Sequence, residues 1–218
     1  MLALYGHPFS SYTWKAQIAL HALGLEYDFR VLEAEFPEHG AIVAQHGGPH
    51  AKFPVLVDDG KVVFEATSII EYLNQRFPAD LPLIPADAAA ALDVRTMDRV
   101  FDNYVMNTMQ GAVAEAIRHP GAPDPVVLAE VTAQLRRTYA WLEEWLAGRE
   151  EGAGAITLVE CAAAPSLFYA DWVEQIGAEF PRLSAWRAHL VALPAVSQCI
   201  EAARPFRSYF PLGAPDRD

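Results

Sequence analysis

The pattern of secondary structure changes near residue 80, and this change is the strongest constraint on how the chain folds. Before residue 80, strand-like and helix-like segments alternate, whereas only helical patterns follow it. Apolar side chains at four-residue spacing predict a helix over residues 11–23, and an Asp-Gly turn between residues 55–57 and 62–64 predicts a β-hairpin. Residues 35–45 give only a weak helix signal. We therefore expect the order β-α-β-α-β-β-α, with a parallel strand pair and an antiparallel hairpin.

A proline-rich segment separates this α/β part from an all-α part. Pro78, Pro82 and Pro85 lie close together, which is typical of a stiff linker. The expected boundaries are residues 1–78 for the N-terminal domain, 79–86 for the linker and 87–218 for the helical C-terminal domain.

Local capping signals mark the helices of the second part. One long or kinked helix is predicted over residues 86–119. Asp124 followed by proline, and the capping box from Thr157 to Glu160, predict the starts of the next two. Two shorter helices are expected near residues 182–193 and 195–203.

The charge and composition exclude several classes of partner. The chain has 218 residues, with 16 basic and 28 acidic side chains and a net charge of −12. An acidic surface disfavours nucleic acid and anionic membranes as partners. No apolar run approaches the ~20 residues that a membrane span needs, and the start lacks a basic signal region. We expect a cytoplasmic protein.

The cysteines and histidines show no pattern that predicts metal or redox chemistry. Cys161 and Cys199 form no Cys-x-x-Cys pair, so we interpret them as buried and inert. His39, His46 and His50 match no zinc spacing, and therefore no metal site is expected.

Two hydroxyls lie where the first strand meets the first helix. Ser10 and Ser11 precede the helical pattern directly, and a helix N-terminus favours negative charge. This position suits an anion such as a thiolate. The simpler alternative is that one serine only caps the helix.

Two further segments offer groups that suit a peptide ligand. Phe53-Pro54 precedes a core strand, and a cis bond there would let the Phe53 backbone pair with an extended ligand; a trans proline at a strand entrance is the alternative. Glu65 then precedes a helix start with hydroxyls at Thr67 and Ser68. Together they suit an ammonium and a carboxylate, although capping alone also explains the hydroxyls.

In this order and spacing, the motifs resemble those of the glutathione S-transferase family. They are Pro-x-Ser at the first helix, Lys-x-Pro-Val-Leu, Glu-x-x-x-Ile-x-x-Tyr-Leu, the proline linker and Thr-x-x-Glu. Residues 10–15 are similar to the Ser-Ser-Cys-x-Trp-Arg segment of zeta-like members. The resemblance implies a thioredoxin-like N-terminal domain joined to an α-helical C-terminal domain, and glutathione as co-substrate.

The resemblance also implies roles for individual residues in glutathione binding. Phe53 and a cis Pro54 would hold the cysteinyl backbone, and Lys52 would lie near the glycyl end. Glu65 and the Ala66 backbone would hold the γ-glutamyl end. The family usually has serine where this chain has Ala66, a loss worth about 0.5–1.5 kcal/mol unless another hydroxyl replaces it. Thr67 and Ser68 are the candidates.

A serine-type member donates a serine hydroxyl to the glutathione sulfur, and Ser10 is the best match. A free thiol has a pKa of ~8.5, so such a donor and a helix N-terminus favour the thiolate. Ser11 is the main alternative. Tyr5 is interpreted as a strand-end core aromatic, and Tyr12 as facing the domain interface.

The long helix of the second part is expected to face the electrophile. The residues that we nominate for the second-substrate pocket are Tyr104, Met106, Asn107 and Gln110. Phe206 and Tyr209 are candidates to close over the cleft. Asp98 and Asp102 are either solvated charges or, in a dimer, acids near the partner's γ-glutamyl ammonium.

The sequence thus predicts a serine-type glutathione transferase that conjugates glutathione to a small apolar electrophile, as a homodimer. A glutathione-dependent isomerase or dehalogenase is an alternative, because it uses the same thiolate on another electrophile. A non-catalytic binding protein is a second alternative, and Ala66 is the feature that most favours it. A disulfide reductase is disfavoured because no cysteine lies at the first helix.

Overall fold

The N-terminal part forms a four-stranded mixed sheet, and its strands and helices follow one another along the chain in the predicted order. The computed structural model describes residues 1–148 and 155–218. The sheet order is β2-β1-β3-β4, in which β1 is parallel to β2 and antiparallel to β3, and β3 is antiparallel to β4. The strands are β1 (Leu2–Gly6), β2 (Asp28–Val31), β3 (Val55–Asp58) and β4 (Lys61–Phe64).

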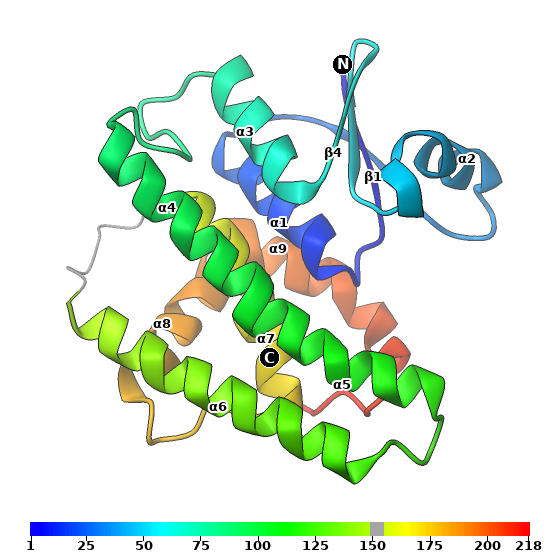
Figure 1. Cartoon of the computed structure of the whole chain (residues 1–218). Coiled ribbons are helices and arrows are strands. Elements are labelled where there is room, and N and C mark those ends of the chain that lie inside the picture. Colours follow the sequence, from blue (N-terminus) through cyan, green and yellow to red (C-terminus); the bar gives the residue numbers. More distant parts are fainter. Residues whose placement is uncertain (149–154) are drawn as a thin grey trace.

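Three helices accompany this sheet: α1 (Ser11–Ala22), α2 (Pro37–His46) and α3 (Ala66–Arg76). Figure 1 shows α1 and α3 on the side that faces the helical part, and α2 on the other side of the strands. The weak signal over residues 35–45 is a regular helix. It begins at Pro37, and buried His39 fixes it to β2 with Nδ1 2.7 Å from the Val31 oxygen.

Helices make up all the regular structure described after residue 80. They are α4 (Ala88–Val100), a π-helical segment (Phe101–Met106), α5 (Asn107–Arg118), α6 (Pro125–Ala147), α7 (Leu158–Val173), α8 (Pro181–Ala192), α9 (Pro194–Ala203) and a 3₁₀ helix (Arg204–Tyr209). The fold is therefore the predicted thioredoxin-like domain with an all-α domain. The single helix expected over residues 86–119 is continuous, but it contains the π-helical segment.

Helix α7 lies at the centre of the helical part. Its residues from Leu158 to Trp172 are all buried. The predicted capping box is present: the Glu160 carboxylate accepts from the Thr157 N–H at 2.8 Å, and the Thr157 oxygen accepts from the Val159 N–H at 3.2 Å. One continuous apolar core joins α7 to α1 and the sheet, so the two parts fold against each other.

A buried cluster of ion pairs joins the two domains. Lys15 of α1 is 1% exposed, and its Nζ lies 2.5 Å from Asp98 and 2.8 Å from Asp102. Asp98 and Asp102 are 1% and 8% exposed, so the interpretation of them as solvated charges is wrong. Arg99 covers the cluster and contacts both carboxylates.

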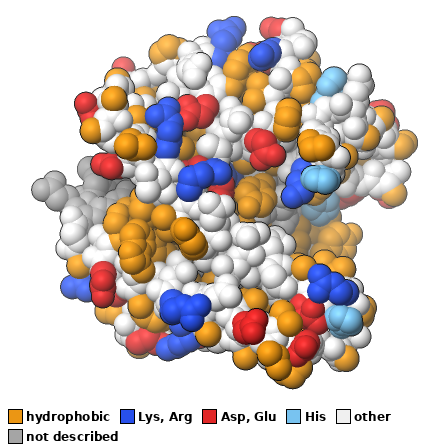
Figure 2. Space-filling model, viewed as in Figure 1, with side chains coloured by type: hydrophobic (Ala, Val, Ile, Leu, Met, Phe, Trp, Pro, Cys, Tyr) orange, Lys and Arg blue, Asp and Glu red, His pale blue; other side chains and the backbone are white. Residues whose placement is uncertain are grey.

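The outer face of the helical part carries a groove of about 540 Å³ between the π-helical segment, α5 and α6. We call it the second groove, to distinguish it from the cavity between the domains that is described below. Tyr104 and Trp141, which are 60% and 48% exposed, line it together with Arg137. Figure 2 shows hydrophobic side chains gathered between α4 and α6 on this face. Among the residues described, no helix is both long and apolar enough to span a membrane.

Candidate functional site

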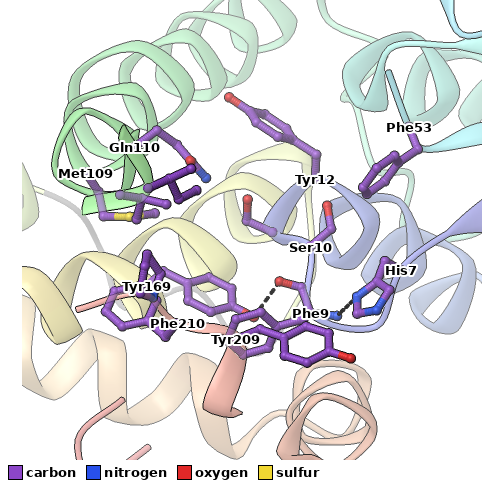
Figure 3. Close-up of a pocket in the computed structure, with 14 residues that line it drawn as sticks. His7, Phe9, Ser10, Tyr12, Phe53, Met109, Gln110, Tyr169, Tyr209 and Phe210 are labelled. Atoms are coloured by element: carbon purple, nitrogen blue, oxygen red, sulfur yellow. Dashed lines mark hydrogen bonds between the residues drawn. The ribbon is translucent and has the colours of Figure 1, made fainter. Parts of the chain in front are cut away.

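A cavity of about 300 Å³ opens at the junction of the two domains. Its walls come from the loop after β1, the start of α1, the residue before Pro54, and the helices α5 and α7 with the segment after α9 (Figure 3). The residues that line it are His7, Phe9, Ser10, Ser11, Tyr12, Phe53, Met109, Gln110, Val113, Ile117, Tyr169, Tyr209, Phe210 and Pro211.

The loop that precedes Ser10 is held by side chains from both domains. Trp14 donates its indole N–H to the Pro8 oxygen at 2.6 Å, and Tyr169 of α7 donates its hydroxyl to the Phe9 oxygen at 3.0 Å. The Phe9 N–H donates to His7 Nδ1 at 3.1 Å (Figure 3). These bonds fix the backbone on both sides of the loop, and they therefore fix where the Ser10 side chain begins.

Ser10 is the N-cap of α1. Its backbone is extended, and its Oγ accepts from the Thr13 N–H at 3.3 Å. Because this bond uses only a lone pair, the hydroxyl proton is free to donate into the cavity. In Figure 3 the Ser10 hydroxyl points to the space between Tyr12 and Phe53. The first turn of α1 contains no acidic residue, so nothing there neutralises the positive helix end. Ser11 also lines the cavity, but it is 6% exposed.

The two tyrosines near this serine differ in position. Tyr12 lines the cavity, and burial raises the pKa of its phenol to about 12, with a smaller contribution from Asp102. Tyr12 is therefore a neutral phenol at physiological pH. Tyr5 is not among the lining residues, and it packs edge-on against His39 at 5.7 Å.

The Phe53–Pro54 bond is cis, as the resemblance implied. Phe53 is 39% exposed and lies on the cavity wall. Exposed Lys52 precedes it, and its N–H donates to the Gly47 oxygen at 2.8 Å. A Cβ at Gly47 would lie 2.3 Å from the Lys52 oxygen, so this close backbone contact requires glycine.

The segment from Glu65 to Ser68 forms the start of α3. Glu65 is the N-cap residue with φ of 68°, a strained backbone conformation for a non-glycine residue. The Glu65 side chain does not cap this helix, so the first N–H groups of α3 are available to a ligand. The Thr67 hydroxyl is already engaged: it accepts from Lys15 at 2.9 Å and donates to Asp98 at 3.1 Å. Exposed Ser68 is the other hydroxyl in this turn.

The structure brings one of the four nominated electrophile residues to the cavity. Gln110 lines it, whereas Tyr104 lies in the second groove. Met106 is 1% exposed and packs in the core, and Asn107 lines neither hollow.

The cavity wall from α5 is instead an apolar row at four-residue spacing, formed by Met109, Val113 and Ile117. This row is visible in the sequence as a helical face. The π-helical segment changes the helix phase just before it, and nothing in the sequence marked that change.

The segment after α9 forms another wall. Tyr209 lines the cavity, and Phe206 packs edge-on against His7 at 4.7 Å. Burial lowers the pKa of His7, so its imidazole is neutral at physiological pH.

The two free cysteines are not among the residues that line this cavity. Cys161 and Cys199 are buried, and burial raises the pKa of both thiols. Over residues 1–148 and 155–218, no group of three histidine, cysteine or acidic residues is placed to hold a metal ion.

Known proteins share both the fold and the sequence pattern of this chain. The family profile "Glutathione S-transferase, N-terminal domain" matches residues 4–81. Glutathione S-transferase U7 of Arabidopsis thaliana is 26% identical over 208 residues, which cover 92% of this chain and 86% of the relative. A probable maleylacetoacetate isomerase of Caenorhabditis elegans is 36% identical over 84 residues, or 38% of each chain.

A solved structure extends the likeness to three dimensions. A glutathione S-transferase from Methylobacillus flagellatus, with glutathione bound, superposes with a TM-score of 0.77 at 25% identity. The match covers 91% of this chain and 98% of that one. The fold is thus that of a thioredoxin-like domain with a helical domain, and the cavity lies between them. The chain is therefore similar to glutathione S-transferases in sequence and in fold, and residues 4–81 match the N-terminal domain of that family.

Proposed function

We propose that this protein binds glutathione, stabilises its thiolate with the Ser10 hydroxyl, and transfers it to a small apolar electrophile. The observation that carries the proposal is the position of Ser10. It lies at the N-terminus of α1, whose first turn contains no acidic residue, and it faces Phe53 across the cavity. One charge-assisted hydrogen bond and a helix N-terminus favour the anion over the thiol. The thiol proton passes to solvent, the sulfur anion forms a carbon–sulfur bond with the electrophile, and the group that it displaces, such as the halide of an aromatic halide, leaves with the electron pair of the broken bond.

Within this proposal, the glutathione backbone lies along Phe53 and Pro54, with the glycyl end near Lys52. The γ-glutamyl end lies at Glu65 and the open N–H groups that begin at Ala66. The Thr67 hydroxyl is already bonded to Lys15 and Asp98, so it does not donate to the ligand; those bonds instead fix the position of the first turn of α3. This leaves Ser68 as the hydroxyl able to replace the serine missing at Ala66.

Ser10 is preferred to Ser11 because Ser10 is partly exposed and its hydroxyl points into the open cavity, whereas Ser11 is buried at 6% exposure. The test is the ultraviolet absorbance of the thiolate when glutathione is added. Ser10→Ala should lose the signal and the conjugating activity, whereas Ser10→Thr should keep part of both. Ser11→Ala is the matched control. Loss of the signal in Ser11→Ala, with retention in Ser10→Ala, would reverse the assignment.

Glutathione-dependent isomerisation is the second candidate, and the local likeness to the maleylacetoacetate isomerase of Caenorhabditis elegans favours it. Both reactions use the same thiolate, so thiolate absorbance does not separate them. A panel that contains a generic aromatic halide and a cis-configured dicarbonyl alkene does. If glutathione fails to bind in calorimetry and no member of the panel reacts, a non-catalytic binding role replaces both.

We also propose that the protein is a homodimer that uses the second groove as its interface. Tyr104 and Trp141 expose a large aromatic surface there, and patches of this kind mark association sites. Light scattering after gel filtration should give twice the 24.0 kDa chain mass. Trp141→Arg should shift it toward the monomer, whereas Trp145→Phe, a conservative change on the same helix, should not.

A further inference from the structure

The segment after α9 returns along α7 and closes one side of the cavity. After the 3₁₀ helix, Phe210 packs edge-on against Trp172 of α7, with ring centroids 5.2 Å apart. Tyr209, Phe210 and Pro211 then form a short wall, which we call the 209–211 wall. Figure 3 shows Tyr209 and Phe210 beside Phe9 and Tyr169, on the side of the cavity away from Phe53.

Charged side chains hold this segment at both ends of the wall. Before it, Arg207 donates to the Asp218 carboxylate at 2.9 Å and to the Arg217 carbonyl at 2.6 Å. After it, Arg217 donates its Nε to the Asp171 carboxylate at 2.9 Å and its Nη2 to the Asp171 carbonyl at 2.7 Å. The wall therefore lies between two anchored segments, and their hydrogen bonds connect it to Asp171 of α7.

Asp171 is suited to anchor these hydrogen bonds. It is 4% exposed, and its second carboxylate oxygen accepts from the Ile176 N–H at 2.8 Å. A buried carboxylate needs partners to offset desolvation, and Arg217 supplies two bonds to this one residue. Arg187 approaches the same carboxylate at 3.6 Å. The same stretch of α7 carries Tyr169, which holds the loop before Ser10.

We propose that the 209–211 wall selects aromatic electrophiles, and that Arg217 is a positioning residue that holds the wall in place through Asp171. This inference rests on the proposed glutathione transfer, because it assigns the electrophile end of that site. Phe9 and Tyr169 pack edge-on at 5.4 Å, and Phe9 and Tyr209 at 6.5 Å. An aromatic ligand placed among these rings gains edge-to-face contacts. A methyl group on the glutathione sulfur has no ring with which to make such contacts.

The test compares two glutathione conjugates that differ only in the group on sulfur. Binding of S-(2,4-dinitrophenyl)glutathione and of S-methylglutathione is measured by calorimetry on the full chain. In Arg217→Gln, affinity for the dinitrophenyl conjugate should fall about tenfold because two aromatic contacts loosen, while affinity for the methyl conjugate should not change. Arg217→Lys should restore part of the loss. Arg95→Gln, which breaks the pair between Arg95 of α4 and Glu71 of α3 and touches neither the wall nor Asp171, is the matched control.

The outcomes separate this inference from the proposed function. If the wild-type protein binds neither conjugate, both are overturned. If it binds both and Arg217→Gln weakens them equally, or weakens neither, the selective wall is refuted and glutathione binding stands. A wild-type protein with equal affinity for both conjugates refutes the wall in the same way. Asp171→Asn should reproduce the selective loss, and its urea midpoint shows whether the Ile176 bond also matters for folding.

Discussion

Replacement of Lys15 by methionine tests whether the buried cluster holds the two domains together. Methionine keeps the length and apolar stem of the side chain but removes the ammonium. That ammonium lies 2.5 Å from Asp98 and 2.8 Å from Asp102, and it donates to Thr67 at 2.9 Å. The variant therefore leaves buried acceptors of both domains without their shared donor.

The expected cost follows from what remains after the change. Loss of one partner from a buried ion pair costs about 3–5 kcal/mol. Arg99 still contacts both carboxylates, although its side chain is 52% exposed. We therefore expect the lower end, about 3 kcal/mol in the free energy of unfolding.

The assay is urea unfolding followed by circular dichroism and by tryptophan fluorescence. Lys61→Met, at an exposed position of β4, is the control and should change stability by less than about 0.5 kcal/mol. A cost below about 1 kcal/mol for Lys15→Met would refute the reasoning, since it would mean that the cluster is solvated or dispensable.

The pH dependence gives an independent check on the same variant. Burial raises the pKa of Asp102 even beside Lys15, which acts to lower it. Without Lys15 this pKa rises further. A carboxyl whose pKa is higher in the folded state favours folding at low pH and opposes it once the pH passes that value. The deficit of Lys15→Met should therefore be smaller at mildly acidic than at alkaline pH, and a deficit that grows on acidification contradicts the assignment.

Three further predictions concern the capping box, a close backbone contact and the thiols. Thr157→Ala should lower the free energy of unfolding by about 1–2 kcal/mol, measured in urea, and Thr157→Ser should lose much less. Gly47→Ala should weaken glutathione binding in calorimetry, because its Cβ would lie 2.3 Å from the Lys52 oxygen and displace the chain before Phe53; unchanged binding contradicts this. Cys161 and Cys199 should react with a thiol reagent only after unfolding, because both are buried with raised pKa values; reaction of the folded protein at the rate of a free thiol contradicts this.

Helix boundaries were predictable where their signals are local. Asp124 followed by proline and the Thr157–Glu160 box determine helix starts through contacts within a few residues, and the structure has both. The hairpin at Gly60 follows from turn chemistry and apolar alternation in the same way. Such features need no knowledge of distant neighbours.

The features that were not predictable depend on neighbours far apart in the sequence. Lys15 and Asp102 are separated by 87 positions, and lysine and aspartate are usually exposed, so their burial together has no local signal. The electrophile residues show a second limit. Met106 and Met109 are both 1% exposed, and only Met109 lines the cavity, so the sequence pattern alone does not tell a core methionine from one on the cavity wall.

The hydrogen bond from Tyr169 to the Phe9 carbonyl has a consequence for the exchange of domains between relatives. The candidate catalytic serine belongs to the α/β domain, yet the loop before it is fixed by a side chain 160 positions later. A chimera that combines residues 1–78 with a foreign helical domain would keep every residue that we propose to contact glutathione. It would still misplace the serine hydroxyl, unless the corresponding helix of the new domain has a hydrogen-bond donor where Tyr169 contacts the Phe9 oxygen. In proteins with this contact, the α/β domain and the helical domain would therefore change together during evolution and would not be freely exchangeable.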